Sequence, residues 1–306
     1  MTSAVVPCEP WRELALHVLA HVPLRDAGSL FDPAYLQWTA TLGLHEPTLH
    51  HDGAVIAGLV AHGPDAPIHR VPLLFAALSG FERVRARTLA ELAPADVDDA
   101  ALLATLQSAP HPGFELLWLG CALALPRWRA VFDQTLAPSL QQAAAALRER
   151  LQSVAVPSLH ATTVQLSSVL GPRGRGFPDA IVVGAPAPWH GGELDHVAMM
   201  VLHEHAVRDL APADADWATA EFAALVCVAD WLASGPAALA VAHRRWVDAL
   251  ALTAMIATLR QTARLDDATA TALQHGARYD TLLALAARGG ITARAGAPAR
   301  PARPDP

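Results

Sequence analysis

The part of this sequence richest in side chains that could do chemistry is the segment 191–207. Its acid–base side chains stand within an otherwise apolar run and are Glu193, Asp195, His196, His203, Glu204 and His205. Imidazole nitrogens and carboxylate oxygens exchange protons and also bind divalent metal ions. Glu193 and His196 have the i, i+3 spacing of di-iron helical bundles, although no second such pair follows. The segment therefore indicates acid–base or metal chemistry.

The spacing of these residues predicts a helix over 192–210, reached from a strand at 180–184 through a proline-containing loop. At about 100° per residue, His196 and His203 share one stripe of this helix, whereas His205 faces almost the opposite way. His203 and His205 therefore cannot both bind one ion from a regular helix. His196 lies two turns before His203, about 10.5 Å along the axis, so a shared ion would require rearrangement.

His203-Glu204 forms the first half of the motif His-Glu-x-x-His, in which two histidines hold zinc and the glutamate activates water. Val207 stands at the position of the second histidine. A strand, a short loop and a His-Glu helix resemble the core of the zincin metallopeptidases over residues 162–210. The resemblance implies that His203 is a zinc ligand, that Glu204 is the general base, and that a strand beside the helix holds substrate.

Further ligands for such a metal could come from Glu13, His17 and His21, which follow one another at intervals of four residues. On a helix this spacing places the three side chains on one face, which is good chelating geometry. We therefore predict a site for zinc or another divalent metal formed by His203, His17, His21 and His196. The alternative is that these histidines are structural residues, hydrogen-bonded to neighbours in their helices.

The composition of the chain argues against several classes of function. The net charge of −7 and the pI of about 6.1 argue against nucleic acid as the main partner. All 22 residues counted as Lys or Arg are arginines, so no lysine is present for a P-loop or a Schiff base. The three cysteines form no Cys-x-x-Cys motif, which argues against a thiolate zinc site and a disulfide framework. Charged residues interrupt the apolar runs, so we expect no secretory leader and no membrane span. The cysteine usage predicts a reducing, cytoplasmic location.

Most of the chain predicts helices. Clear start signals occur at Pro10 and at Asp32-Pro33, and a helix over 127–152 is expected to kink or restart at Pro138. Further short helices are predicted between residues 53 and 125. After residue 214 the sequence predicts three helices, the last two over 237–261 and 266–288.

One part of the sequence predicts β-structure instead. Residues 162–169 alternate polar and β-branched side chains, the run 180–184 predicts a return strand, and a glycine-rich turn separates them. The expected fold class is mainly α (α+β), an irregular helical bundle with one small antiparallel β-hairpin.

Changes in composition divide the chain into three predicted parts. These are an N-terminal helical region at 1–153, a region with the β-hairpin and the His-Glu helix at 154–291, and a disordered tail at 292–306. The leading functional hypothesis is a metal-dependent hydrolase, a degenerate zincin-like peptidase with Glu204 as the catalytic residue. The alternative is a non-catalytic helical protein-interaction or scaffold module. Its partner would be a peptide or protein, without a role for nucleic acid or membranes.

Overall fold

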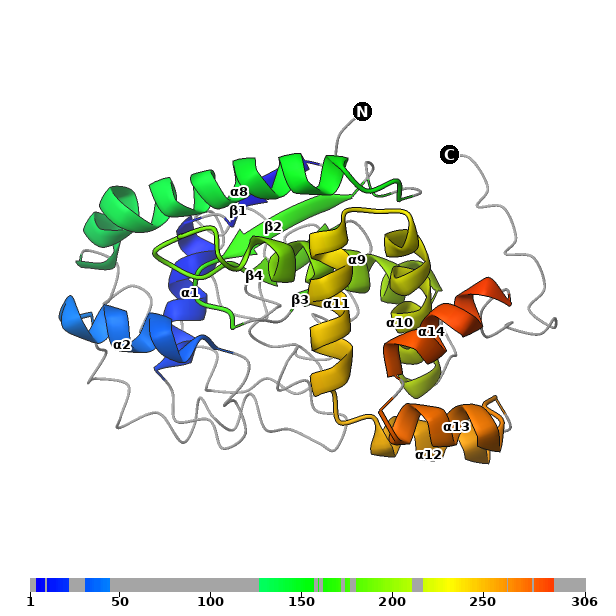
Figure 1. Cartoon of the computed structure of the whole chain (residues 1–306). Helices are drawn as coiled ribbons and strands as arrows, with labels where there is room; N and C mark the ends of the chain where they lie inside the picture. Colours follow the sequence, from blue (N-terminus) through cyan, green and yellow to red (C-terminus); the bar gives the residue numbers. More distant parts are fainter. Residues whose placement is uncertain are drawn as a thin grey trace, which may run out of the picture. The chain divides into compact units, whose positions relative to one another are not determined.

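A computed structural model of the chain gives the fold (Figure 1). Residues 1–208 form one compact unit and residues 209–306 form another, and each is described by itself. The boundaries predicted at 153/154 and 291/292 stay predictions. The residues that the structure describes are 4–8, 10–21, 31–44, 127–156, 159, 162–171, 174–176, 180–210, 217–262, 264–276 and 278–288.

In the described part of the first unit, four strands form a sheet with the order β1-β2-β4-β3. β1 (Ala4–Pro7), β2 (Thr163–Ser167) and β4 (Ala180–Gly184) run parallel to one another. The short β3 (Gly174–Gly176) pairs antiparallel with β4 at the edge of the sheet. The carboxyl ends of three strands therefore lie along one edge.

The predicted antiparallel hairpin is wrong, because β2 and β4 are parallel neighbours. After β2 the chain passes to the other side of β4 and pairs there as β3 before it enters β4. The reversal of direction thus lies between β3 and β4, and the segment predicted as a turn contributes the edge strand β3. The mainly helical character that the sequence predicts is confirmed for the described residues.

The centre of the sheet is apolar. Val5 of β1 lies opposite Val164 of β2, and Val164 lies opposite Ile181 of β4. All three side chains are buried. Burial of these residues gives the sheet a hydrophobic core that stabilises its register, because a slip by one residue would expose them.

The first unit also contains helices that precede, cover and follow the sheet. α8 packs along β1 and β2 (Figure 1), and Arg148 donates from Nη2 to the Val5 carbonyl oxygen at 2.9 Å. The helices described in this unit are α1 (Pro10–Ala20), α2 (Pro33–Thr41), α8 (Ala137–Gln152) and α9 (Leu194–Leu210), which ends just past residue 208, with a π-helical turn, η3 (Phe132–Leu136), directly before α8.

Local sequence accounts for two of these helix starts. Asp32 caps α2, because its Oδ1 accepts a hydrogen bond from the Ala34 amide at 2.9 Å, and Pro33 occupies the first turn. The prediction for this helix is therefore confirmed. Pro138 lies in the first turn of α8, directly after η3. The wider π turn accommodates a proline ring and its missing N–H without ending the helix.

The second unit is helical throughout its described part. Its apolar core is formed by residues from all of these helices, among them Phe222, Val247, Leu259, Leu273 and Leu282. The helices are α10 (Trp217–Ala233), α11 (Ala237–Ala249), α12 (Thr253–Gln261), α13 (Asp267–Gln274) and α14 (Arg278–Ala287).

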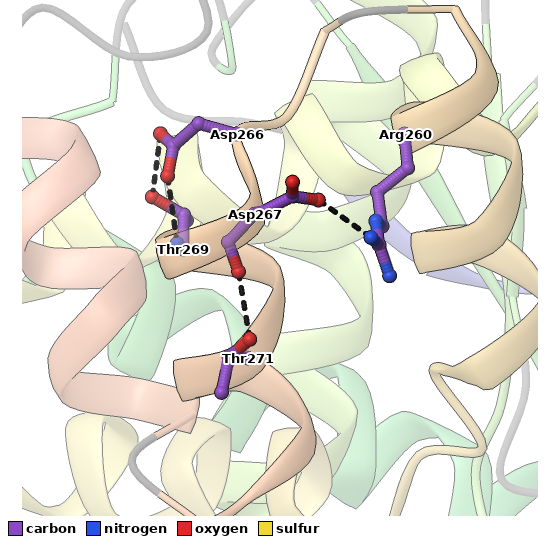
Figure 2. A network of polar contacts seen from close by, with 5 residues as sticks. All are labelled: Arg260, Asp266, Asp267, Thr269 and Thr271. Atoms are coloured by element: carbon purple, nitrogen blue, oxygen red, sulfur yellow. Dashed lines mark hydrogen bonds and ion pairs between the residues drawn. The ribbon is translucent and has the colours of Figure 1, made fainter.

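Two helices predicted in this unit are each split in the structure. Leu250 adopts an extended backbone between α11 and α12, and Gly276 adopts φ of 106° between α13 and α14. Figure 2 shows the start of α13, where Asp266 accepts hydrogen bonds from the amide and hydroxyl of Thr269 at 2.8 and 2.9 Å. This cap starts the helix at the position that the sequence predicts.

Within the described residues, every helix is too short or too polar to cross a bilayer. The short helices predicted between residues 53 and 125 and the predicted tail at 292–306 lie outside the described residues.

Candidate functional site

A cavity of about 360 Å³ lies at the carboxyl ends of β2 and β4. Its lining includes Leu170 and Gly171, which follow β2, and Gly184, which ends β4. Asp32 at the start of α2 and His196 in the first turn of α9 also line it. In open α/β sheets, ligands bind at the carboxyl edge of parallel strands. This cavity is therefore our candidate functional site.

A close backbone approach shapes this cavity. A Cβ atom built on Gly184 would overlap the carbonyl oxygens of Leu170 and Gly171. The Ala185 amide, one residue further on, donates to the Ser167 carbonyl oxygen at 2.8 Å. Only glycine lets the end of β4 lie this close to the segment that follows β2.

The cavity brings together acid–base groups that are far apart in the sequence. Asp32, Glu193, His190 and His196 all contribute to its lining. The Nε2 atom of His196 is buried and makes no hydrogen bond to any described residue. Sequence analysis predicted His196 as a metal ligand and did not predict this cavity.

Two contacts to α8 hold the segment that enters α9. The Trp189 amide donates to Ser139 Oγ at 2.7 Å. Arg150 Nε forms an ion pair with Asp195 Oδ1 at 3.1 Å, and both side chains are about one-third exposed. The segment 189–195, which includes several cavity-lining residues, is therefore held against α8 at both of its ends.

Glu204, predicted as the catalytic base, contacts the edge strand β3. Its Oε2 accepts a hydrogen bond from the Gly176 amide at 2.9 Å. A Cβ atom on Gly174 would lie 2.8 Å from the Glu204 Cγ atom, so β3 passes directly against this side chain. The carboxylate thus accepts a hydrogen bond from an amide of the edge strand that would otherwise lack a partner in the sheet. Its catalytic role stays a prediction.

The other two histidines of α9 are buried. His203 is 2% exposed and His205 is fully buried. The Nδ1 atom of His205 lies 2.9 Å from Arg208 Nη2, which also donates to Thr162 Oγ1 at 2.8 Å. Glu204 therefore lies between two buried imidazoles, as the helical spacing predicts.

His17 and His21, the predicted completing ligands, lie close to each other on α1. Their ring centroids are 4.5 Å apart. His17 Nδ1 shares a hydrogen bond of 3.0 Å with the Tyr35 hydroxyl, and His21 Nδ1 lies 2.8 Å from the His17 carbonyl oxygen. The His21 contact fits the structural alternative, in which the histidines bond to neighbours in their helices, whereas His17 bonds to a residue of another helix, α2.

Among the described residues, no three His, Cys, Asp or Glu side chains are arranged to hold a metal ion. His17, His21, His196 and His203 therefore form no common ligand set in that part of the chain. Metal binding stays a prediction, and no step proposed below depends on it.

A buried polar cluster lies next to the carboxyl end of β2. Glu13 of α1 is fully buried, and its Oε2 accepts hydrogen bonds from the Ser168 amide at 3.2 Å and hydroxyl at 2.8 Å. Burial raises the pKa of Glu13 to about 7, although hydrogen bonds from Ser167 and Ser168 lower it. Burial and the charge of Glu13 raise the pKa of Tyr35 well above its ordinary value. Sequence analysis named Glu13 but missed the tyrosine and serines, which the fold alone brings to it.

A second depression, over α12 and α13 of the second unit, is a weaker candidate for a functional site. Arg260, Asp266 and Asp267 line it. Arg260 pairs with Asp267, and Asp266 caps α13 (Figure 2). Its charged groups are thus already engaged in holding the helices.

Comparison with protein family models, curated proteins and solved structures finds no match to this chain. Its function therefore has to be argued from its own residues.

Proposed function

We propose that the first unit is a hydrolase for a small polar substrate and that the reaction takes place in the cavity at the carboxyl ends of β2 and β4. The observation that carries this proposal is His196, which lines the cavity and has a buried Nε2 without a hydrogen bond to any described residue. A histidine nitrogen of this kind accepts a proton from water or donates one to a leaving group.

Two neighbouring features support a hydrolytic reaction. Glu193 lines the same cavity three residues before His196, so the cavity also holds a carboxylate that can take part in proton transfer. The first turn of α9 begins at the cavity, and amides of a first helical turn stabilise a developing oxyanion. One acid–base residue typically contributes about 10²–10⁴-fold to a rate, which sets the size of the expected effect.

The test is a hydrolysis screen of the purified full chain with small esters, amides and phosphomonoesters. We expect His196→Gln to lower kcat/KM by about 100-fold or more. His275→Gln changes an exposed histidine of the second unit and serves as the matched control, with unchanged activity expected. Equal turnover by the parent and His196→Gln, or no turnover of any substrate, overturns the proposal in favour of the interaction module.

Two further arms separate this proposal from the metal-dependent reaction predicted from the sequence. Activity that survives a chelator assigns water activation to His196, whereas activity that zinc restores supports the metal site. Glu204→Gln tests whether the reaction takes place at Glu204 instead of in the cavity. If this variant is folded but inactive while His196→Gln is active, Glu204 is the catalytic residue.

A further inference from the structure

The buried carboxyl group of Glu13 holds a segment that forms part of the cavity. Ser168, which donates two hydrogen bonds to Glu13, stands two residues before Leu170. Leu170 and the next residue, Gly171, line the cavity. The contact between α1 and Ser168 therefore fixes one end of the short segment 168–171. The other end of this segment lines the cavity.

A second contact from α1 reaches α2, another element that lines the cavity. His17, one turn after Glu13, shares a hydrogen bond with the Tyr35 hydroxyl of α2. The start of α2 is in turn bonded to the same segment, because the Asp32 amide donates to the Val169 carbonyl oxygen at 2.9 Å. Helix α1 thus holds both the 168–171 segment and α2.

We propose that Glu13 is a positioning residue for the cavity and that the 168–171 segment loosens when the carboxyl group of Glu13 ionises. The proposal rests on the cavity being the functional site. Its test, however, needs no substrate. A failed hydrolysis screen and a failed test of Glu13 are therefore distinguishable results.

The surroundings of Glu13 explain why ionisation would loosen the segment. Its Oε1 is buried without a hydrogen bond to any described residue, so a full negative charge has only the donors on Oε2 to stabilise it. Tyr35 on α2 lies close enough for the charge of Glu13 to act on its hydroxyl, and His17, which bonds to that hydroxyl, lies one turn after Glu13 on α1. The charge of Glu13 disfavours ionisation of Tyr35, whose hydroxyl therefore stays neutral.

Opening of the segment would return the carboxyl group to water and lower its pKa. With a pKa of about 7 in the closed state and the ordinary value of 4.5 in the open state, the opening constant rises with pH. Proton linkage gives a rise of roughly 70-fold between pH 5 and pH 8.

Hydrogen–deuterium exchange, corrected for the intrinsic chemical rate at each pH, measures this opening. In the parent we expect exchange of peptides covering 168–171 to follow the roughly 70-fold rise. Glu13→Gln keeps an acceptor for Ser168 but cannot ionise, so its opening constant should not change with pH. Thr39→Val, at a buried polar residue of α2 outside the cluster, should follow the parent.

Ser168→Ala provides a second measurement if Glu13→Gln does not fold. Loss of the hydroxyl donor removes a bond that favours the ionised form, so the rise in exchange should move to higher pH. An exchange profile that Glu13→Gln shares with the parent, or a midpoint that Ser168→Ala leaves unchanged, overturns the proposal.

Discussion

Among the glycines in the described part of the chain, Gly184 is the one where adding a single methyl group should do the most damage. A Cβ atom on this residue overlaps the carbonyl oxygens of Leu170 and Gly171 and lies 2.9 Å from the Leu170 carbonyl carbon. These are backbone atoms in a close-packed interior and cannot swing aside as a flexible side chain can. Gly184→Ala therefore has to separate β4 from this segment and strain the hydrogen bond from Ala185 N to Ser167 O.

The size of the effect follows from the nature of the obstacle. Overpacking of an interior typically costs about 1–3 kcal/mol. Because rigid backbone blocks the new methyl group here, we expect a cost near the upper end, about 3 kcal/mol. The usual gain from replacing glycine inside a strand, about 0.5–1 kcal/mol, leaves a net loss of about 2–2.5 kcal/mol. With about 2–4 °C per kcal/mol for a chain of this size, Tm should fall by about 4–10 °C.

Thermal unfolding followed by circular dichroism measures this loss. Gly192→Ala is the matched control, because Gly192 lines the same cavity and a Cβ atom there meets nothing within 4 Å. Its Tm should stay within about 2 °C of the parent, since surface substitutions cost about 0.5 kcal/mol or less. If Gly184→Ala unfolds at the same temperature as Gly192→Ala, the close approach of β4 to the 170–171 segment is refuted.

Three further predictions concern carboxyl groups. Glu204→Ala should cost about 1–2 kcal/mol in chemical denaturation, because the Gly176 amide loses a charged acceptor, and Glu204→Gln should cost less; equal costs would contradict this role. Asp266→Ala should lower Tm more than Asp266→Asn, because asparagine still accepts from the Thr269 amide, and parent-like Tm values for both would argue against the cap. The raised pKa of Glu13 means that its contribution to stability is fully present below pH 4.5 and is lost as pH rises through about 7. Urea unfolding should therefore show a parent that loses about 2.5 kcal/mol between pH 5 and 8 relative to Glu13→Gln, and parallel curves would contradict it.

Helix positions follow from local sequence wherever a specific start or stop signal exists. Asp32 places the start of α2, and the Ser234-Gly235-Pro236 sequence ends α10 after Ala233. The prediction of two long continuous helices is wrong where the backbone conformation of a single residue interrupts the helix. Leu250 carries no breaking signal, yet it is extended between α11 and α12, whose buried residues belong to one core. Packing in the folded unit therefore decides a break that helix propensity does not predict.

The direction of the strands was harder to predict than their positions. The run Ala180–Gly184 is buried from Ile181 onward, and a continuously buried run is typical of a strand inside a parallel sheet. The sequence carries this signal, but proximity in the chain favours a hairpin between the runs 162–169 and 180–184. β1, at Ala4–Pro7, pairs with residues about 160 positions away. Such pairing leaves no local signal, because it depends on how the whole unit closes.

The prediction of the candidate site from sequence has the same limit as the prediction of the strands. Helical periodicity describes α9 as if it were isolated. From periodicity alone, His203 and Glu204 can be interpreted only by the residues one turn away in the same helix. In the folded unit Glu204 instead meets the amide of Gly176, while His196 lies at a cavity shared with Gly184 and Asp32. These neighbours come from the edge strand, the end of β4 and the start of α2. Residue types and spacing therefore identify the groups able to react, but the order of parallel strands determines which of them reach a common cavity.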